Sequence, residues 1–394
     1  MALLHYTAPP VAGGVEAILG EHRRLLALAG HDVLVLAGRG DATLVPELDS
    51  RHPEVEALYQ ALRAGEFDPA VFAELQERIR ARLEPLLADR ELVIAHNVGT
   101  MPFNLPLAAA LADGTTPVLH WVHDIAWLNP RYEGFHREGP PYDLLHQAQP
   151  GAGYVVISEV RRRELQGLLG IDPEVIPNGI DLDQFLGVTS ETRTLLREAG
   201  MDDADPLVLV PLRVTRRKRL ELALEAAARL RPRFPGLGMV VTGPLGPHAG
   251  DNRDYWRELF ELRARLALDD VVAFLHELAP KGAVHPVGPS TMAELYRISD
   301  VVLLPSDAEG FGLPVIEAAA VRAPIVCSDI EVLREIGGAG MHAFPAAGGA
   351  EAVAAAVTAA LQEPIVEERR RVAATYSWDR ILPRLEGAVE RLLA

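Results

Sequence analysis

The chain has 394 residues, of which 49% are hydrophobic and 24% charged. This composition is ordinary for a globular protein, excludes a disordered or collagen-like chain, and at this length predicts two or three domains. The formal net charge is −17 at pH 7, and a surface that acidic argues against nucleic acid or an anionic membrane as the main partner.

The single cysteine, Cys327, can build neither a disulfide framework nor a thiolate metal site. The N-terminus lacks the basic and apolar regions of a signal peptide, and the chain has no run of about 18 apolar residues. We therefore expect a cytoplasmic protein without a transmembrane segment. Peripheral membrane contact through an amphipathic helix stays open.

Short β-rich runs alternate with longer helical patterns along the whole chain, which is typical of βαβ units and parallel sheets. In the first half the predicted strands are 3–6, 32–36, 92–95, 117–121, 154–157 and 174–177, with helices such as 15–29 and 160–169 between them. A second series of predicted strands comprises 207–211, 238–242, 271–274, 301–304, 324–327 and 341–344. Because two sheets of this size exceed one compact domain, we expect an α/β fold with two doubly wound, Rossmann-like domains.

The boundary between the domains is predicted near residues 178–200, where Asn178 and Gly179 form a turn signal. Two long irregular segments, 124–149 and 277–289, are rich in Gly, Pro and His. Loops of that length in a compact fold are usually functional or mobile.

Two glycines, Gly13 and Gly14, follow the first predicted strand and directly precede the helix that begins at Val15. At a strand-to-helix turn, glycines let backbone N–H groups and a helix N-terminus approach an anion closely. An anion-binding turn and a plain tight turn both fit this pattern. The Gly-x-Gly-x-x-Gly fingerprint of dehydrogenases and the Gly-Lys-Ser/Thr of P-loops are absent, which disfavours both classes.

A basic cluster lies at the start of a helix predicted over 220–230. It comprises Arg213, Arg216, Arg217, Lys218 and Arg219. Cations there oppose the helix macrodipole unless an anion compensates them, so we favour a phosphate or diphosphate ligand over a solvated basic face. Lys218 is one of only two lysines among the 38 basic residues; the other, Lys281, lies in the segment 277–289 and has no physical explanation.

A glycine-rich loop follows the apolar strand 301–304 and leads into a helix whose first turn accommodates Pro314. Candidate donors to a polar or anionic ligand are the N–H groups of Phe311, Gly312 and Leu313. Glu309 in the loop and Glu317, expected in the first turn of the helix, are eight positions apart, and carboxylates suit the vicinal hydroxyls of a sugar or ribose. The alternative is that Glu317 only complements the helix N-terminus and Glu309 is solvated.

Histidines mark the carboxyl ends of two predicted strands, where open α/β sheets place ligand sites. We expect His123 to contact substrate and His120 to be packed in the structure. His96 and Asn97 are candidates to line the same cleft. Convincing further metal ligands are lacking, so no metal site is predicted.

Together these motifs resemble the retaining nucleotide-sugar glycosyltransferases of the GT-B fold, specifically glycosyltransferase family 4, over most of the chain. The residues that carry the resemblance are Gly13-Gly14-Val15-Glu16, His123-Asp124, Ile176-Pro177-Asn178-Gly179-Ile180-Asp181, Arg213 with Lys218, Glu309 with Glu317, Ala323-Pro324-Ile325-Val326-Cys327-Ser328 and Glu335-Ile336-Gly337-Gly338. The family implies two Rossmann-like domains facing a central cleft. Residues 1–182 with a returning C-terminal helix at 376–394 would be the acceptor side, and residues 183–375 the nucleotide-sugar-binding domain.

The resemblance also implies a role for each matching residue. Arg213 and Lys218 would hold the donor diphosphate, and Glu317 would clamp the nucleotide ribose. Glu309 would lie beside the transferred sugar, which His123 would contact near its reacting face. The other donor-binding residues would be Gly13, Gly14, Gly243, Phe311, Gly312 and Leu313.

We therefore expect a hexosyltransferase that moves a hexose from a nucleoside-diphosphate sugar of UDP, GDP or ADP type to a hydroxyl acceptor, with retention and front-face attack. The acceptor would be a sugar, a small polyol or a lipid-linked glycan, and neither a metal nor another cofactor is expected. Two alternatives stay open: another GT-B enzyme, such as a nucleotide-sugar epimerase or a glycoside phosphorylase, and a non-catalytic subunit that binds a nucleotide sugar or a glycan. Leu212 and Arg219 replace common family glycines and 277–289 resembles an insertion, so the base preference and the loop conformation stay open. The acceptor stays undetermined because the fold binds it mainly through variable loops of the first domain, here including 124–149, and the sugar of the donor is open too.

Overall fold

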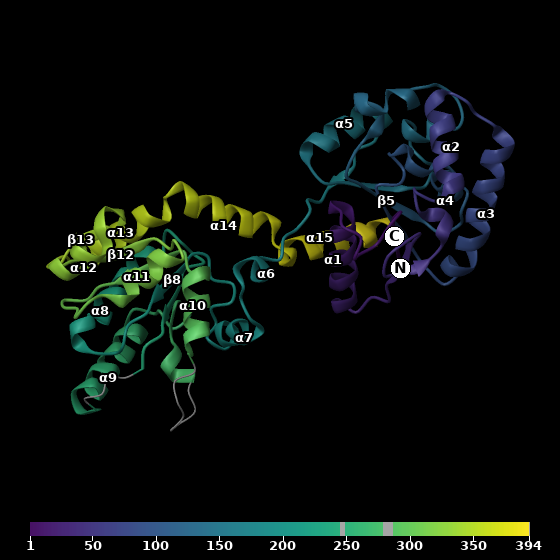
Figure 1. Cartoon of the computed structure of the whole chain (residues 1–394). Coiled ribbons are helices and arrows are strands. Elements are labelled where there is room, and N and C mark those ends of the chain that lie inside the picture. The colour runs from purple at the N-terminus through teal and green to yellow at the C-terminus, as the bar shows by residue number, and fades with distance from the viewer. Residues whose placement is uncertain (245–248, 279–286, 394) are drawn as a thin grey trace. The chain divides into compact units, whose positions relative to one another are not determined.

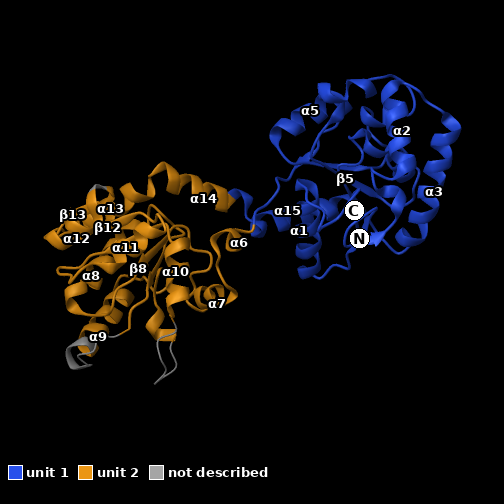
Figure 2. Ribbon diagram, viewed as in Figure 1, with its two compact units in different colours: residues 1–180, 375–394 blue, residues 181–374 orange. Residues whose placement is uncertain are grey.

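The computed structural model describes residues 1–244, 249–278 and 287–393 and divides into two compact units (Figure 1). Unit 1 comprises residues 1–180 and 375–394, and unit 2 comprises residues 181–374 (Figure 2). Each unit has its own parallel sheet and its own hydrophobic core. Lys281, which the sequence left unexplained, lies outside the described residues.

Unit 1 is built on a seven-stranded parallel sheet in the order β3-β2-β1-β4-β5-β6-β7. Its strands are β1 (Ala2–Leu4), β2 (Leu34–Ala37), β3 (Thr43–Leu44), β4 (Val93–His96), β5 (Val118–Val122), β6 (Gly153–Val156) and β7 (Glu174–Val175). Its α-helices are α1 (Gly14–Leu28), α2 (Pro53–Ala64), α3 (Pro69–Leu87), α4 (Leu105–Ala112), α5 (Glu159–Leu169) and α15 (Trp378–Leu393). The irregular segment 124–149 forms three short 3-10 helices, η3 (Ala126–Leu128), η4 (Pro130–Phe135) and η5 (Tyr142–Leu145).

Helices cover both faces of this sheet, because neighbouring residues of a strand point to opposite sides. Leu4 packs in one cluster with residues of α2, α3 and α4, whereas Leu3 packs in another with residues of α1 and α15. The C-terminal helix α15 adds Trp378, Ile381 and Leu385 to the second cluster. Residues from the end of the chain are therefore part of the core of unit 1.

Unit 2 is built on a six-stranded parallel sheet in the order β10-β9-β8-β11-β12-β13. Its strands are β8 (Leu207–Val210), β9 (Gly238–Val241), β10 (Val272–Phe274), β11 (Val301–Leu304), β12 (Ile325–Asp329) and β13 (His342–Pro345). Its α-helices are α6 (Leu182–Leu186), α7 (Ser190–Glu198), α8 (Leu220–Leu230), α9 (Ala249–Arg265), α10 (Pro289–Ile298), α11 (Leu313–Ala320), α12 (Glu331–Gly337) and α13 (Ala350–Leu361); α14 (Pro364–Tyr376) leads out of the unit. Counted within the unit, the strand order is the 3-2-1-4-5-6 order of the Rossmann fold.

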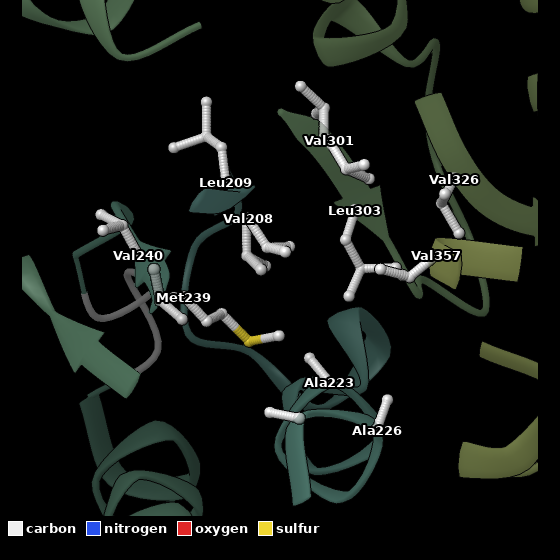
Figure 3. Packing of buried hydrophobic residues seen from close by; sticks show 14 of the residues in the cluster. Val208, Leu209, Ala223, Ala226, Met239, Val240, Val301, Leu303, Val326 and Val357 are labelled. Carbon is white, nitrogen blue, oxygen red and sulfur yellow. The ribbon is translucent and has the colours of Figure 1, made fainter. Parts of the chain in front are cut away.

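The strands of unit 2 are almost continuously apolar, as expected for parallel strands buried on both faces. Figure 3 shows Met239, Leu303 and other strand side chains beside Ala223 and Ala226 of α8 and Val357 of α13. These helices and strands belong to one buried cluster, which fixes the sheet whose strand ends carry the loops described below.

All twelve predicted strands are present, with their ends shifted by two residues at most. The sequence missed β3, whose two residues, Thr43 and Leu44, are exposed and too few to show a hydrophobic period. The predicted α/β fold with two doubly wound, Rossmann-like units is confirmed. Among the described residues, none of the helices has the length and apolar character needed to cross a membrane.

Candidate functional site

The strand order of unit 2 reverses between β8 and β11, so the loops that follow these two strands diverge to opposite sides of the sheet. Ligands of open α/β sheets bind at such a switch point, outside the carboxyl ends of the strands. Residues 211–219 follow β8 and residues 305–312 follow β11. The two loops are connected by a backbone hydrogen bond in which Asp307 N donates to Arg217 O over 2.9 Å.

Lys218 and Glu309 form an ion pair at this switch point. The Lys218 Nζ lies 2.5 Å from each carboxylate oxygen of Glu309, and the two side chains are 10% and 8% exposed. The buried Ser306 donates a hydrogen bond from Oγ to Glu309 Oε1 over 2.6 Å. The Lys218 ammonium is thus fixed beyond the end of β8. It is held by Glu309, a second candidate site residue, from the loop that follows β11.

Carboxylates of unit 2 also pair with other members of the basic cluster. Arg216 makes a bidentate pair with Glu258, and Arg219 lies 3.1 Å from Asp307. Protein groups therefore supply part of the compensation that the sequence argument assigned to a bound anion. Within the described ranges, no carboxylate pairs with Arg213, whose side chain is exposed.

Gly243 follows β9 and lies against the backbone of the basic loop. A Cβ at this position would approach Leu212 O to 2.0 Å and Arg213 Cα to 2.4 Å, so a side chain would force the two segments apart. The amide of Val214 donates to Pro244 O over 3.1 Å. The structure thus brings Gly243 beside Arg213, two residues that the sequence assigned to one donor site.

The glycine-rich loop after β11 ends at Gly312, which is the N-cap of α11. Gly312 has φ +96°, a left-handed conformation that favours glycine, and a Cβ there would lie 2.8 Å from Leu333 Cδ2. No side chain caps this helix. In the part of the chain that the structure describes, the N–H groups of Phe311, Gly312 and Leu313 have no recorded acceptor.

Glu317 differs from its predicted position, because it is the fifth residue of α11 and lies in the second turn of the helix. This position argues against the alternative that Glu317 only complements the helix N-terminus, because that electrostatic effect is largest in the first turn. The hydroxyl of the buried Tyr296 on α10 donates to Glu317 Oε2 over 2.6 Å. Burial, and then the bond to this carboxylate, raise the pKa of Tyr296, so the phenol stays protonated.

His123 belongs to unit 1, where it follows β5 and lines a pocket of about 870 Å³ at the carboxyl end of the sheet. Gly14, Asp124, Ser158 and Arg161 also line this pocket. Gly14 is the first residue of α1, and Gly13 is its N-cap. Of the two predicted glycines, the pocket therefore includes Gly14.

Asn97 and Arg161 hold the backbone at His123. Asn97, in a left-handed conformation with φ +56° at the end of β4, accepts hydrogen bonds at Oδ1 from His123 N and Asp124 N over 3.2 and 3.0 Å. Arg161 Nε donates to His123 O over 3.2 Å. Sequence reasoning did not assign these roles, although Asn is a residue that tolerates this backbone conformation.

Burial lowers the pKa of His123 to about 4, so its imidazole is neutral at pH 7. Its Nε2 lies 3.4 Å from His96 Nδ1. The expectation that His96 lines the cleft is wrong, because this side chain is fully buried beneath His123. His120 is buried too, with its Nε2 2.9 Å from Gln149 Oε1.

One group of metal-compatible side chains was not anticipated. Glu138, Asp143 and His146 offer ligand atoms that lie within 4.8 Å of one another. Asp143 Oδ1 already accepts a hydrogen bond from Gly139 N over 2.9 Å and lies 3.3 Å from His146 Nε2. These contacts fix the turn around η5, and the absence of a metal from the reaction stays a prediction.

Two family models match the chain in succession. The model described as "Glycosyltransferase Family 4" matches residues 12–184, and the model described as "Glycosyl transferases group 1" matches residues 192–377. The chain belongs to the family 4 glycosyltransferases. Its two Rossmann-like units are those of the GT-B fold.

Curated relatives of this glycosyltransferase differ in their acceptors by name. The D-inositol 3-phosphate glycosyltransferase of Geodermatophilus obscurus is 33% identical over 57% of this chain and 49% of its own length, so the match spans about half of that relative. The mannosylglucosylglycerate synthase of Thermotoga maritima is 23% identical over 85% of this chain and 81% of its own. Among solved structures, Anabaena Alr3699/HepE in complex with UDP is similar over 99% of this chain and 100% of that one, with 18% identity and a TM-score of 0.37.

Proposed function

We propose that this glycosyltransferase moves a hexose from a nucleoside-diphosphate sugar to a hydroxyl acceptor, with retention at the anomeric carbon and without a metal ion. The observation that carries the proposal is the pairing of Lys218 with Glu309 at the switch point of unit 2. It places a fixed cation and a carboxylate, from two different loops, at the edge of the sheet where the fold binds ligands.

Unit 2 would bind the donor. Lys218 and the exposed Arg213 supply positive charge for the diphosphate, and the uncapped N-terminus of α11 offers backbone N–H groups. Negative charge grows on the leaving diphosphate as the bond from the anomeric carbon to oxygen breaks. Groups aimed at that charge stabilise the transition state more than the ground state.

Two carboxylates of unit 2 would contact the donor through hydroxyl groups. Glu317 is oriented by Tyr296 and suits the ribose, and Glu309 suits the transferred sugar once the diphosphate replaces it at Lys218. Each carboxylate can accept hydrogen bonds from two neighbouring hydroxyls. The presence of cationic and hydroxyl-binding groups in a single unit supports a nucleoside-diphosphate sugar as the proposed donor.

Unit 1 would bind the acceptor in the pocket beside His123. Because the His123 ring is neutral, it exchanges hydrogen bonds with hydroxyl groups and does not act as a fixed cation. In the proposed step, the acceptor oxygen bonds to the anomeric carbon on the face that the diphosphate leaves, and the acceptor proton passes to the leaving phosphate oxygen. This balance requires no separate general base.

The variant Lys218→Ala tests the donor site. It removes a charged contact to the diphosphate, and we expect kcat/KM to fall by about 100-fold or more. Arg216→Ala is the matched control, because Arg216 lies in the same turn, is exposed and pairs with Glu258. Transfer by Lys218→Ala at the wild-type rate would contradict the donor assignment.

Product analysis separates the reaction classes. We expect an α-linked product from an α-linked donor and equal rates with and without EDTA. An inverted product or an absolute need for a divalent ion would overturn the proposed mechanism. Consumption of the donor without an acceptor would favour an epimerase, and consumption only with inorganic phosphate would favour a phosphorylase. Binding of the donor without turnover would favour a non-catalytic subunit.

A further inference from the structure

The His123 pocket of unit 1 has an unusual charge arrangement for a protein similar to a glycosyltransferase that is named for a phosphorylated acceptor. The charged side chains that line this pocket are Asp124, Arg161 and Glu164. Two are carboxylates and one is a guanidinium, and the neighbouring His123 adds no charge at pH 7. The charged lining therefore sums to −1, although its one arginine is the residue type that commonly binds phosphate.

Each of the three side-chain nitrogens of Arg161 donates to a protein acceptor. Its Nη1 donates to Glu164 Oε2 over 2.5 Å, its Nη2 to Asp124 Oδ1 over 3.2 Å, and its Nε to the carbonyl of His123 over 3.2 Å. A bidentate bond to a phosphate needs two adjacent nitrogens of the fork. Each nitrogen already carries one of these contacts, and the two remaining N–H groups, one on Nη1 and one on Nη2, belong to nitrogens that already donate to carboxylates, so a phosphate bound there would lie close to two negative charges.

Asp124 is held in place by its backbone. Its N–H donates to Asn97 Oδ1 over 3.0 Å, and its carbonyl accepts a hydrogen bond from Thr100 Oγ1 over 2.7 Å. Its side chain is 56% exposed although one oxygen pairs with Arg161. The carboxylate therefore points a hydrogen-bond acceptor at solvent in the pocket, which suits a hydroxyl group and repels an anion.

The N-terminus of α5 also lies at this pocket, and it is the other group that favours an anion. Ser158 caps it by accepting a hydrogen bond from Arg161 N over 3.2 Å, and Glu159 occupies the first turn. Ser158 thus satisfies one N–H group of the helix start, and the Glu159 carboxylate adds negative charge in the first turn. A phosphate, with a charge of about −1.5 to −2 at pH 7, would meet two carboxylates without an unpaired cation.

We infer that this pocket selects an uncharged, hydroxyl-rich acceptor and discriminates against a phosphorylated one, with Asp124, Arg161 and Glu164 as the determinants. The inference rests on the proposed function only in naming the pocket's occupant as the acceptor. It assigns Asp124 and Glu164 to specificity, because they neutralise the one arginine that would otherwise bind a phosphate.

Titration with inorganic phosphate at pH 7.5 tests the charge selection directly. We compare three proteins: the wild type, the double variant Asp124→Asn/Glu164→Gln, and a third variant that adds Arg161→Ala to the double variant. The readout is the part of the phosphate binding that depends on Arg161. We expect no Arg161-dependent binding in the wild type. In the double variant we expect phosphate to bind about tenfold or more tightly than in the third variant, which lacks Arg161. Asp172→Asn is the matched control, since it removes the charge of a carboxylate that pairs with Arg162, on the same helix but outside the pocket lining.

Arg161-dependent binding of phosphate by the wild type, or no gain in the double variant, would overturn the inference. A second experiment uses only the wild type and paired acceptors: myo-inositol against D-inositol 3-phosphate, and glucose against glucose 6-phosphate. We expect the uncharged member of a pair to have the higher kcat/KM, and the reverse order would also overturn the inference. If no acceptor is glycosylated with any nucleotide sugar, the proposed function fails while the phosphate titration still decides the charge selection.

Discussion

Individual buried histidines make the stability of unit 1 depend on pH. Burial lowers the pKa of His22 to about 3 and those of His120 and His123 to about 4. In the unfolded chain these rings take up a proton near pH 6.5. The unfolded state therefore binds more protons between these values, so the stabilisation is complete above pH 6.5 and is lost as the pH falls toward the folded pKa.

His22→Phe isolates one of these contributions. Both ring nitrogens of His22 are buried without a recorded hydrogen-bond partner among the described residues, and its ring packs edge-on against Trp121 and Trp378. Phenylalanine keeps an aromatic ring there and cannot titrate. Between pH 7.5 and 5.0 we expect the variant to lose about 2 kcal/mol less unfolding free energy than the wild type.

Urea unfolding followed by tryptophan fluorescence at the two pH values measures this difference. His31→Gln is the control, because His31 is partly exposed and lies 3.4 Å from Glu386. An equal loss of stability in His22→Phe and the wild type would show that His22 does not carry the pH dependence.

Glu309 competes with the diphosphate for the same cation, which leads to a second prediction at a single residue. Glu309→Gln removes a negative charge that lies 2.5 Å from Lys218 Nζ. We expect UDP to bind about tenfold more tightly, since the lysine no longer has to leave an ion pair, while kcat falls because the sugar loses a carboxylate. Calorimetric titration with UDP and steady-state kinetics measure the two effects, and Asp307→Asn, which pairs with Arg219, is the control. Weaker UDP binding to Glu309→Gln would contradict this competition.

Between elements, Asn97 connects the ends of β4 and β5. Asn97→Ala leaves the amides of His123 and Asp124 without their acceptor, and it puts alanine at φ +56°, a left-handed conformation that asparagine tolerates better. We expect a loss of about 2 kcal/mol of unfolding free energy and a large fall in kcat/KM for the acceptor. The affinity for UDP should be unchanged, because Asn97 belongs to unit 1.

Asn97→Asp is the conservative companion, since its carboxylate keeps an acceptor for both amides. We expect Asn97→Asp to retain more activity than Asn97→Ala. We expect Asn97→Gly to restore the left-handed backbone conformation without restoring the two hydrogen bonds. If all three variants transfer sugar equally well, the side-chain bonds to the β5 end do not position His123.

The elements were predictable to the extent that their signals are local. Buried parallel strands are continuous apolar runs, and the glycine that caps α11 needs a backbone conformation that few residues adopt. The hydrogen-bond and ion-pair partners of the site residues were not predictable, because they come from distant segments of the chain. Examples are Glu258 for Arg216, Tyr296 for Glu317 and Asn97 for the backbone of His123. Glu317 shows the same limit within one helix, where a boundary error of one residue moves a side chain between turns.

At the scale of the whole molecule, unit 1 depends on a helix from the end of the chain, whereas unit 2 does not. The helix α15 contributes Trp378, Ile381, Leu385, Ala388 and Val389 to the core of unit 1. Burying an apolar side chain of this size contributes about 1.5–3 kcal/mol, so their sum is on the order of 10 kcal/mol. That equals the typical net stability of a domain, about 5–15 kcal/mol.

We therefore expect a chain truncated after residue 376 to keep a folded unit 2 and to lose unit 1. The sheet and the buried cluster of unit 2 are formed within residues 181–374, so UDP should still raise its melting temperature. Hydrogen exchange followed by mass spectrometry separates the two units, and protection should disappear from β1, β4 and β5 while it persists in β8, β9 and β11. Protection of β1 in the truncated chain would show that the helices α1 to α5 suffice for the core of unit 1, and that α15 only covers it.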